Sequence, residues 1–168
     1  MTESASPLAV EAISTLADAG LTVAVAESLT GGALCAELVS VPGASTVLRG
    51  AVVAYDTALK SSLLGVPAEL LAEHGPVHAD VARLMAEGVR VAAAVGGHPA
   101  DIGVATTGVA GPDSQGDAPV GLVFVAVADE SGATVREFRF DGDRAEVRAR
   151  AVAAAIELMI ERLREFSG

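Results

Sequence analysis

The sequence predicts an α/β protein in which a mixed sheet carries helices on both faces. Short apolar runs alternate with longer amphipathic stretches along the chain, which is typical of strands that alternate with helices. The last two apolar runs flank Asp129-Glu130-Ser131-Gly132 and indicate a hairpin, so part of the sheet is antiparallel. The 168 residues suit one domain over 1–168, and its core must be aliphatic because 51% of the residues are hydrophobic and only 3% aromatic.

Cap and breaker residues set the limits of the predicted elements. Ser6-Pro7 is typical of a helix start, and Gly20 of a helix end. Val41-Pro42-Gly43 stops the second helix, and Asp56 can cap a short helix that carries Lys60. In chain order we expect a helix over 7–19, a strand over 21–26, a helix ending near 40, a strand over 48–55, a short helix ending before 65, a helical turn from 67, a helix over 79–95, a strand over 102–106, hairpin strands over 120–128 and 134–140, and a helix over 143–165.

Composition and charge exclude several classes of function. A formal net charge of −11 repels nucleic acid and anionic lipid, so an anionic small substrate would need a local cluster of donors. No apolar run approaches the ~20 residues of a membrane span. Met1-Thr2-Glu3-Ser4 lacks the basic and apolar segments of a leader, so we expect a cytoplasmic protein. Cys35, the only cysteine, leaves no internal disulfide and is expected as a small core residue.

Lys60 is the only lysine among eleven basic residues, and it lies five positions after Tyr55, the only tyrosine. Guanidinium keeps its proton in proteins, whereas a desolvated ammonium can lose it. The one position that keeps lysine is therefore a candidate general base, with Tyr55 as a proton relay or donor. The alternative is an ordinary solvated lysine. The histidines offer no obvious base, and the sequence contains no clustered His/Cys set, so we expect neither metal nor cofactor.

Ser28 lies in the segment that follows the first predicted strand and precedes Gly31-Gly32 at a helix start. Open α/β sheets bind ligands at the carboxyl ends of their strands. Ser28 is thus a candidate nucleophile, and backbone N–H groups near Thr30, Gly31 and Gly32 could stabilise a developing oxyanion. The alternative is that Ser28 or Thr30 only caps the helix.

A glycine-rich loop over 108–119 follows the third predicted strand and could meet the other two segments at the same edge. Its backbone at Gly108, Ala110 and Gly111 could bind a phosphate, although such loops are also ordinary connectors. Arg144 or Arg148, at the start of the last helix, could reach a phosphate or carboxylate, against the alternative of a solvated surface arginine.

Together and in this order, these segments resemble the CinA C-terminal domain family over nearly the whole chain. The motifs that carry the resemblance are Ala26-Glu27-Ser28-Leu29-Thr30-Gly31-Gly32, Tyr55 with Lys60 and Leu64-Gly65-Val66, His74-Gly75-Pro76-Val77, Gly108-Val109-Ala110-Gly111-Pro112, Pro119-Val120-Gly121, and Gly142-Asp143-Arg144 with Val147-Arg148. The chain departs from the family pattern at Thr57, His78, Ser114-Gln115 and Ala118.

The resemblance implies a three-layer α/β/α fold and a nicotinamide-nucleotide amidohydrolase. Such enzymes convert nicotinamide mononucleotide to nicotinate mononucleotide and ammonia, and the family's serine nucleophile, lysine and tyrosine fall on Ser28, Lys60 and Tyr55. Full-length members carry an additional N-terminal domain similar to molybdopterin-binding proteins, whose activity we expect to be absent here. We therefore expect a nucleotide substrate and a homo-oligomer. The alternatives are an amidase that acts on another carboxamide, and a non-catalytic binding or interaction module.

Overall fold

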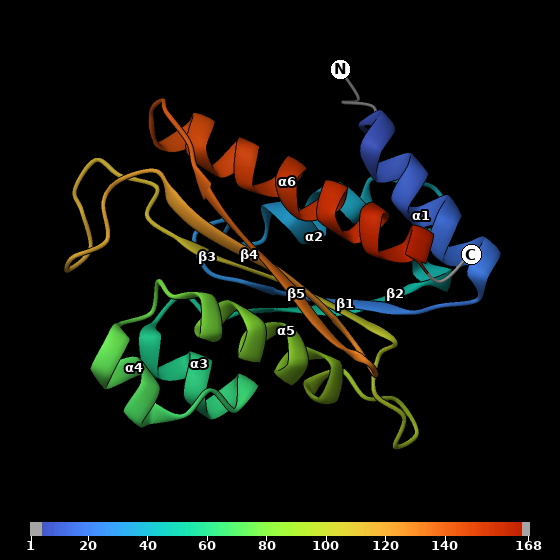
Figure 1. Ribbon diagram of the computed structural model, residues 1–168. Coiled ribbons are helices and arrows are strands. Elements are labelled where there is room, and N and C mark those ends of the chain that lie inside the picture. Colours follow the sequence, from blue (N-terminus) through green and yellow to red (C-terminus); the bar gives the residue numbers. More distant parts are fainter. Residues whose placement is uncertain (1–4, 166–168) are drawn as a thin grey trace.

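The computed structural model describes residues 5–165, which form one five-stranded sheet flanked by helices (Figure 1). The strand order is β2-β1-β3-β4-β5. Strands β2, β1 and β3 run parallel, whereas β3, β4 and β5 pair antiparallel, so the sheet is mixed as predicted. The elements are α1 (Pro7–Ala19), β1 (Val23–Glu27), α2 (Ala33–Val39), the 3₁₀ turn η1 (Ala44–Thr46), β2 (Leu48–Val53), α3 (Thr57–Leu64), α4 (Ala68–His74), α5 (Ala79–Ala92), β3 (Ile102–Gly108), β4 (Leu122–Asp129), β5 (Gly132–Arg139) and α6 (Arg144–Glu165).

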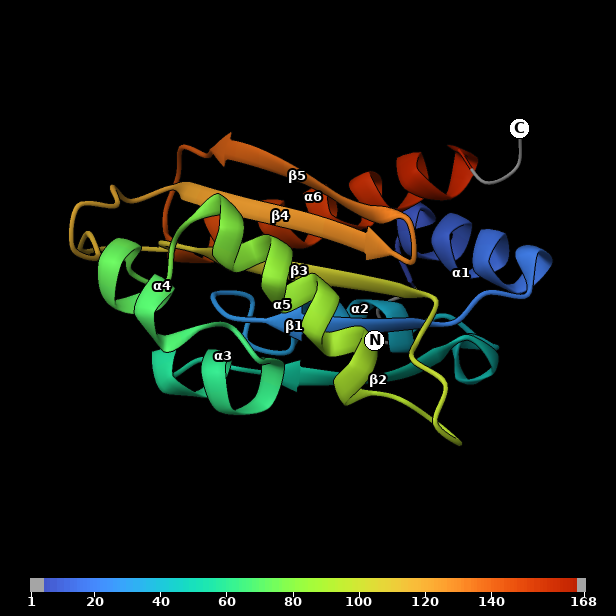
Figure 2. The ribbon, with the colours of Figure 1, turned by 60° about the horizontal axis from the view of Figure 1, so that its bottom comes forward.

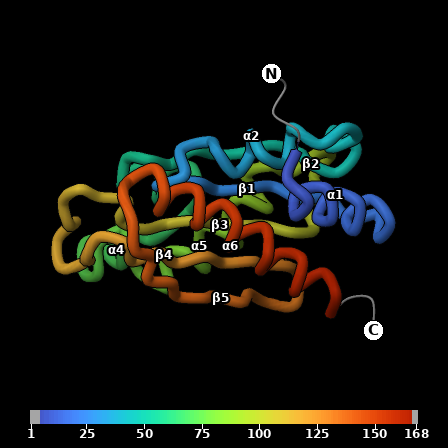
Figure 3. Tube along the Cα trace, turned by 90° about the horizontal axis from the view of Figure 1, so that it is seen from above, coloured from blue at the N-terminus to red at the C-terminus, as the bar shows by residue number. Residues whose placement is uncertain are grey.

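Helices cover both faces of the sheet, which confirms the three-layer α/β/α fold. Helices α1, α2 and α6 lie on one face and α3, α4 and α5 on the other (Figure 1), and α6 runs along β3 and β4 (Figure 3). Successive strand residues point to opposite faces. Val23 and Val25 of β1 therefore enter the core beneath α1, α2 and α6, whereas Ala24 and Ala26 enter the core beneath α5. A side chain at Gly103 would overlap the carbonyl oxygen of Ala86, so this glycine lets α5 approach the sheet closely.

The cap residues act as predicted. The Ser6 side chain accepts a hydrogen bond from the N–H of Ala9, and that of Asp56 accepts one from Ala58. Helix α5 ends at 92 rather than 95 because Val95 and His98 form a small bridge.

The parallel strands bring three distant segments to one edge of the sheet. Glu27, the last residue of β1, lies opposite Val53 of β2 on one side and Thr106 of β3 on the other. The residues that follow these three strands therefore emerge together. Figure 2 shows the loop over 109–121 extending beyond this edge, close to α4.

Among residues 5–165, no helix is long and apolar enough to cross a membrane. The inference about a missing leader concerns residues 1–4, which lie outside the described residues.

Candidate active site

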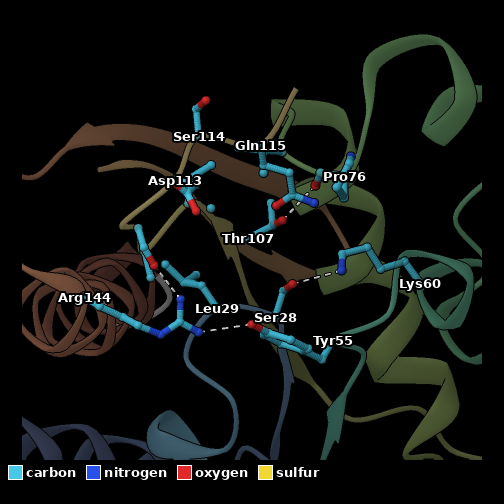
Figure 4. Close-up of a pocket in the computed structure, with 15 residues that line it drawn as sticks. Ser28, Leu29, Tyr55, Lys60, Pro76, Thr107, Asp113, Ser114, Gln115 and Arg144 are labelled. Carbon is cyan, nitrogen blue, oxygen red and sulfur yellow. Dashed lines mark hydrogen bonds between the residues drawn. The ribbon is translucent and has the colours of Figure 1, made fainter. Parts of the chain in front are cut away.

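A cavity of about 300 Å³ opens at the carboxyl edge of β1 and β3 (Figure 4). Its volume is at the lower end of the range for small-molecule sites. It is lined by Ser28, Leu29, Tyr55, Lys60, Pro76, Val77, Thr107, Gly108, Val109, Ala110, Gly111, Asp113, Ser114, Gln115 and Arg144. Three segments that the sequence analysis singled out, after β1, after β2 and after β3, thus meet at one cavity, as does Arg144 from the start of α6.

Ser28 and Lys60 are in direct contact at the floor of this cavity. The Lys60 Nζ donates a 2.9 Å hydrogen bond to the Ser28 Oγ and a 2.7 Å hydrogen bond to the carbonyl oxygen of Ala54. Only 1% of the Lys60 surface is exposed, which is unusual for a lysine without a carboxylate in contact. Figure 4 shows the long side chain extending from α3 toward Ser28. The alternative of a solvated surface lysine is therefore wrong.

The surroundings of Lys60 make its neutral form easier to reach than that of an ordinary lysine. Burial lowers the pKa of the Lys60 ammonium from 10.5 to about 8, and the nearby carboxylate of Asp56 opposes part of this change. A neutral amine keeps two N–H groups and one lone pair. Because the Ala54 carbonyl accepts one N–H, the lone pair can face the Ser28 hydroxyl. This arrangement can remove the proton from a serine, as the base of a Ser-Lys pair must.

Glu27, which precedes Ser28, occupies the N-terminus of α2. Its fully buried carboxylate accepts hydrogen bonds from the N–H groups of Gly32, Leu34 and Cys35 at 2.8–3.0 Å. An anion at a helix N-terminus is stabilised by the free N–H groups and the helix dipole. Here that anion is the protein's own side chain, a role that the sequence analysis did not identify.

The prediction that the N–H groups of Gly31 and Gly32 stabilise an oxyanion is therefore wrong. The N–H of Gly31 donates to the Ser28 carbonyl, and that of Gly32 to Glu27. Thr30 is fully buried beside Thr106 and does not line the cavity. Leu29 does line it, and within residues 5–165 its N–H has no hydrogen-bond partner. Leu29 is thus the better placed donor beside Ser28.

Tyr55 and Arg144 form one side of the cavity entrance. The Arg144 Nη2 donates to the Tyr55 hydroxyl at 3.1 Å, and its Nη1 donates to the Gly111 carbonyl at 2.7 Å. Tyr55 is 60% exposed and does not lie between Ser28 and Lys60, which touch directly. The direct contact favours proton transfer straight to Lys60 over a relay through Tyr55, and the tyrosine lines the cavity as predicted (Figure 4).

The glycine-rich loop forms the wall opposite Lys60. A side chain on Gly108 would place its Cβ 2.6 Å from the Leu122 carbonyl oxygen, so the loop leaves β3 at a position where only glycine fits. Gly108, Ala110 and Gly111 all line the cavity. In the described part of the chain, the N–H groups of Ala110 and Gly111 have no protein partner, so both remain able to bind an anion.

Of the two arginines considered as candidate phosphate ligands, Arg148 does not line the cavity. Its guanidinium donates to the carbonyl oxygens of Leu29 and Thr30 instead. Cys35 lies outside the cavity as well. It is partly buried against the core, and burial together with the nearby Glu27 raises the pKa of its thiol.

Comparison with known proteins identifies the family. Residues 5–163 match the family model described as the CinA C-terminal domain. The chain belongs to this family. It is 47% identical over 138 residues to a CinA-like protein from Frankia casuarinae, and 43% identical over 145 residues to one from Geobacter sulfurreducens. These matches cover 82% and 86% of this chain but 31% and 34% of the relatives, so the chain spans about a third of the length of the curated relatives that it matches.

Solved structures of CinA proteins share the fold. A CinA superfamily protein from Klebsiella pneumoniae superposes with a TM-score of 0.88 at 31% identity, covering 94% of this chain and 96% of that one. A competence/damage inducible protein from Agrobacterium tumefaciens gives a TM-score of 0.86 at 33% identity and covers 96% and 98%. The mixed α/β sandwich is thus the architecture of a CinA C-terminal domain.

Several cavity residues were not predicted individually, although Asp113 and Gln115 belong to the glycine-rich loop that the sequence singles out. Thr107 donates its hydroxyl to the Pro76 carbonyl, which joins the end of β3 to the segment before α5. Asp113 and Gln115 reach the cavity from the glycine-rich loop (Figure 4). Only the turn of that loop brings them back over the site. Glu27 had a usable signal, because a carboxylate shortly before a helix start is suited to bind its free N–H groups.

Proposed function

We propose that this CinA C-terminal domain hydrolyses the carboxamide of nicotinamide mononucleotide to nicotinate mononucleotide and ammonia. The observation that carries the proposal is the contact between Lys60 Nζ and Ser28 Oγ at 2.9 Å, made by a buried amine whose pKa is about 8. The matching of this chain to the CinA C-terminal domain model supports it. A nucleophile that touches its base, at the floor of a small cavity, is the arrangement that acyl transfer requires.

The first half of the reaction forms an acyl-enzyme. Neutral Lys60 accepts the Ser28 hydroxyl proton as the Ser28 Oγ attacks the carboxamide carbon. The carbonyl oxygen becomes an oxyanion, which the Leu29 N–H stabilises. Such a donor is worth about 3 kcal/mol in comparable sites. The Lys60 ammonium then protonates the carboxamide nitrogen, the C–N bond breaks, and ammonia leaves.

The second half releases the acid. Water enters in place of ammonia, and neutral Lys60 takes a proton from it as the hydroxide adds to the ester carbon. The C–O bond to Ser28 breaks, and Lys60 returns the proton to the Ser28 Oγ. The acid product loses its carboxyl proton to solvent, where ammonia can take it up, and leaves as nicotinate mononucleotide. The net reaction consumes one water, and Lys60 ends in the state in which it began.

The opposite end of the cavity suits the phosphate of the substrate. A chain with a net charge of −11 must concentrate donors locally to hold an anion. Arg144 supplies a guanidinium at the entrance, and Ala110 and Gly111 supply backbone N–H groups beside it. With the phosphate there, the nicotinamide ring extends toward Ser28. Gly108 and Tyr55 also line the cavity.

The test is ammonia release from nicotinamide mononucleotide by the wild-type chain and by Ser28→Ala. We expect turnover by the wild type and a loss of several orders of magnitude in the variant, with nucleotide binding retained. Nicotinamide, asparagine and glutamine serve as competing carboxamides. If only another amide is hydrolysed, the proposed substrate is wrong and that amide takes its place. If nicotinamide mononucleotide binds but no ammonia is released from any amide, the chain is a binding module. Activity of Ser28→Ala within about threefold of wild type would remove Ser28 as the nucleophile.

A further inference from the structure

Arg148 holds the backbone of the segment that carries Ser28. From α6, its Nε donates to the Leu29 carbonyl oxygen and its Nη2 to the Thr30 carbonyl oxygen, both at 2.9 Å. A guanidinium is planar and presents its N–H groups in a fixed fork, so it can hold two neighbouring carbonyls at once. Arg148 is therefore engaged with the two residues that directly follow Ser28.

Other contacts hold the same segment from the opposite side. The buried Glu27 carboxylate accepts the N–H groups of Gly32, Leu34 and Cys35, just beyond the carbonyls that Arg148 binds. The Thr30 hydroxyl bonds that of Thr106 on β3 at 2.8 Å. The turn between β1 and α2 is thus fixed through its carbonyls by a cation and through its N–H groups by an anion.

We propose that Arg148 is a positioning residue for Ser28, one that sets the reactivity of the serine without touching the substrate. This role rests on the nucleophile of the proposed function but not on the identity of its substrate. The C=O and N–H groups of one trans peptide point in opposite directions. Holding the Thr30 carbonyl toward α6 therefore directs the N–H of the same peptide, that of Gly31, to the Ser28 carbonyl, which accepts it at 3.1 Å. The turn fixed in this way keeps the Ser28 Oγ against Lys60.

If Arg148 had a purely structural role, a different result would be expected. If Arg148 only stabilised α6 against α2, its loss would lower the melting temperature and leave the reactivity of folded Ser28 unchanged. A positioning role lowers the reactivity of Ser28 in protein that is still folded. Displacement of a reacting group by about 1 Å can cost about a hundredfold in rate. The pH at which reactivity rises should stay the same, because Lys60 and its surroundings are intact.

The experiment measures the rate at which phenylmethylsulfonyl fluoride labels Ser28, followed by intact-protein mass spectrometry on the full chain. This reaction forms a sulfonyl ester at the serine with loss of fluoride and needs no nucleotide. We expect Arg148→Ala to label at least about tenfold more slowly than wild type, with an unchanged pH midpoint. Added guanidinium should restore part of the rate, because it can refill the position between the two carbonyls. The matched control is Arg150→Ala, since Arg150 is exposed on the same helix and its side chain makes no hydrogen bond within residues 5–165.

Each outcome decides a separate point. Labelling of Arg148→Ala at the wild-type rate overturns the positioning role. Should this variant not fold, Arg148→Lys carries the test: its single ammonium cannot reproduce the fork, so wild-type labelling in that variant also overturns the role. Slow labelling that guanidinium accelerates, with the Arg150 variant unaffected, supports it. A wild type that labels at Ser28 but releases no ammonia from any nucleotide refutes the proposed function and leaves the role of Arg148 standing. A wild type with no labelling at Ser28 contradicts both.

Discussion

Replacement of Lys60 by arginine tests whether this side chain acts by losing its proton. The substituted arginine would keep the positive charge and a long stem, but a guanidinium stays protonated at any pH at which the protein is folded. If Lys60 is the general base, Lys60→Arg should lose at least about a hundredfold in kcat/KM, the size of effect expected for loss of an acid–base group. If Lys60 serves only as a cation, arginine should preserve most of the activity.

The pH dependence of the wild type follows from the same pKa. With the pKa of Lys60 at about 8, roughly a tenth of the amine is neutral at pH 7, half at pH 8 and nine tenths at pH 9. Because only the neutral form accepts the Ser28 proton, kcat/KM should rise about fivefold from pH 7 to pH 8 and by less than about twofold from pH 8 to pH 9. An ordinary lysine pKa of 10.5 would instead give a rise of about tenfold in each interval.

The assay is initial-rate ammonia release from nicotinamide mononucleotide between about pH 6.5 and 9.5 at constant ionic strength. Nucleotide binding by Lys60→Arg, measured by calorimetry, controls for the larger guanidinium displacing Ser28. The general-base role is refuted by either of two results: an arginine variant that keeps most of the wild-type rate, or a wild-type rate that does not change with pH across this range.

Three further predictions concern the substrate, the buried amine and the helix N-terminus. Nicotinamide riboside, which lacks the phosphate, should have a much lower kcat/KM than the mononucleotide, and Arg144→Ala should narrow that difference; equal values for both substrates in the wild type would contradict a phosphate site at Arg144. Because the folded protein lowers the pKa of Lys60 to about 8, the unfolded chain binds more protons between pH 8 and 10.5, so the free energy of unfolding should gain a rising component with pH in this window. Urea unfolding should detect this rise in the wild type but not in Lys60→Met. If the free energy of unfolding changes with pH equally in both proteins, the lowered pKa of Lys60 is contradicted. Glu27→Gln should lower the free energy of unfolding by about 3 kcal/mol, because the new amide NH₂ group would face backbone N–H donors. The control variant Glu87→Gln, which removes one partner of an exposed ion pair, should lower it by less than about 1 kcal/mol. Similar losses of stability in the two variants would show that the Glu27 carboxylate is not needed.

The sequence by itself determined the order and type of the elements. Local signals were enough to place a helix boundary where a single residue caps the helix. Ser6 and Asp56 do so at helix starts, and Gly20 and Gly65 at helix ends. It also singled out Ser28 and Lys60 as candidates, Ser28 because it follows a strand and Lys60 because it is the only lysine among ten arginines. These signals are local or compositional, so they can be read without knowing which strands pair.

Only the tertiary structure decided which groups meet. Lys60 is 32 positions from Ser28, and the two touch because β1 and β2 are parallel neighbours whose carboxyl ends share one edge. Arg148 and Arg144 lie four residues apart on α6, yet one holds the backbone of the serine segment and the other borders the cavity. A helix turns each successive residue by about 100°, so four positions preserve the face but shift the side chain by a full turn along the axis. Which carbonyl or cavity lies beside each turn depends on how α6 packs against the rest of the fold. Tertiary packing also decides which anion binds the backbone N–H groups at the start of α2. The buried Glu27 carboxylate occupies these donors, so they are not available to a substrate oxyanion.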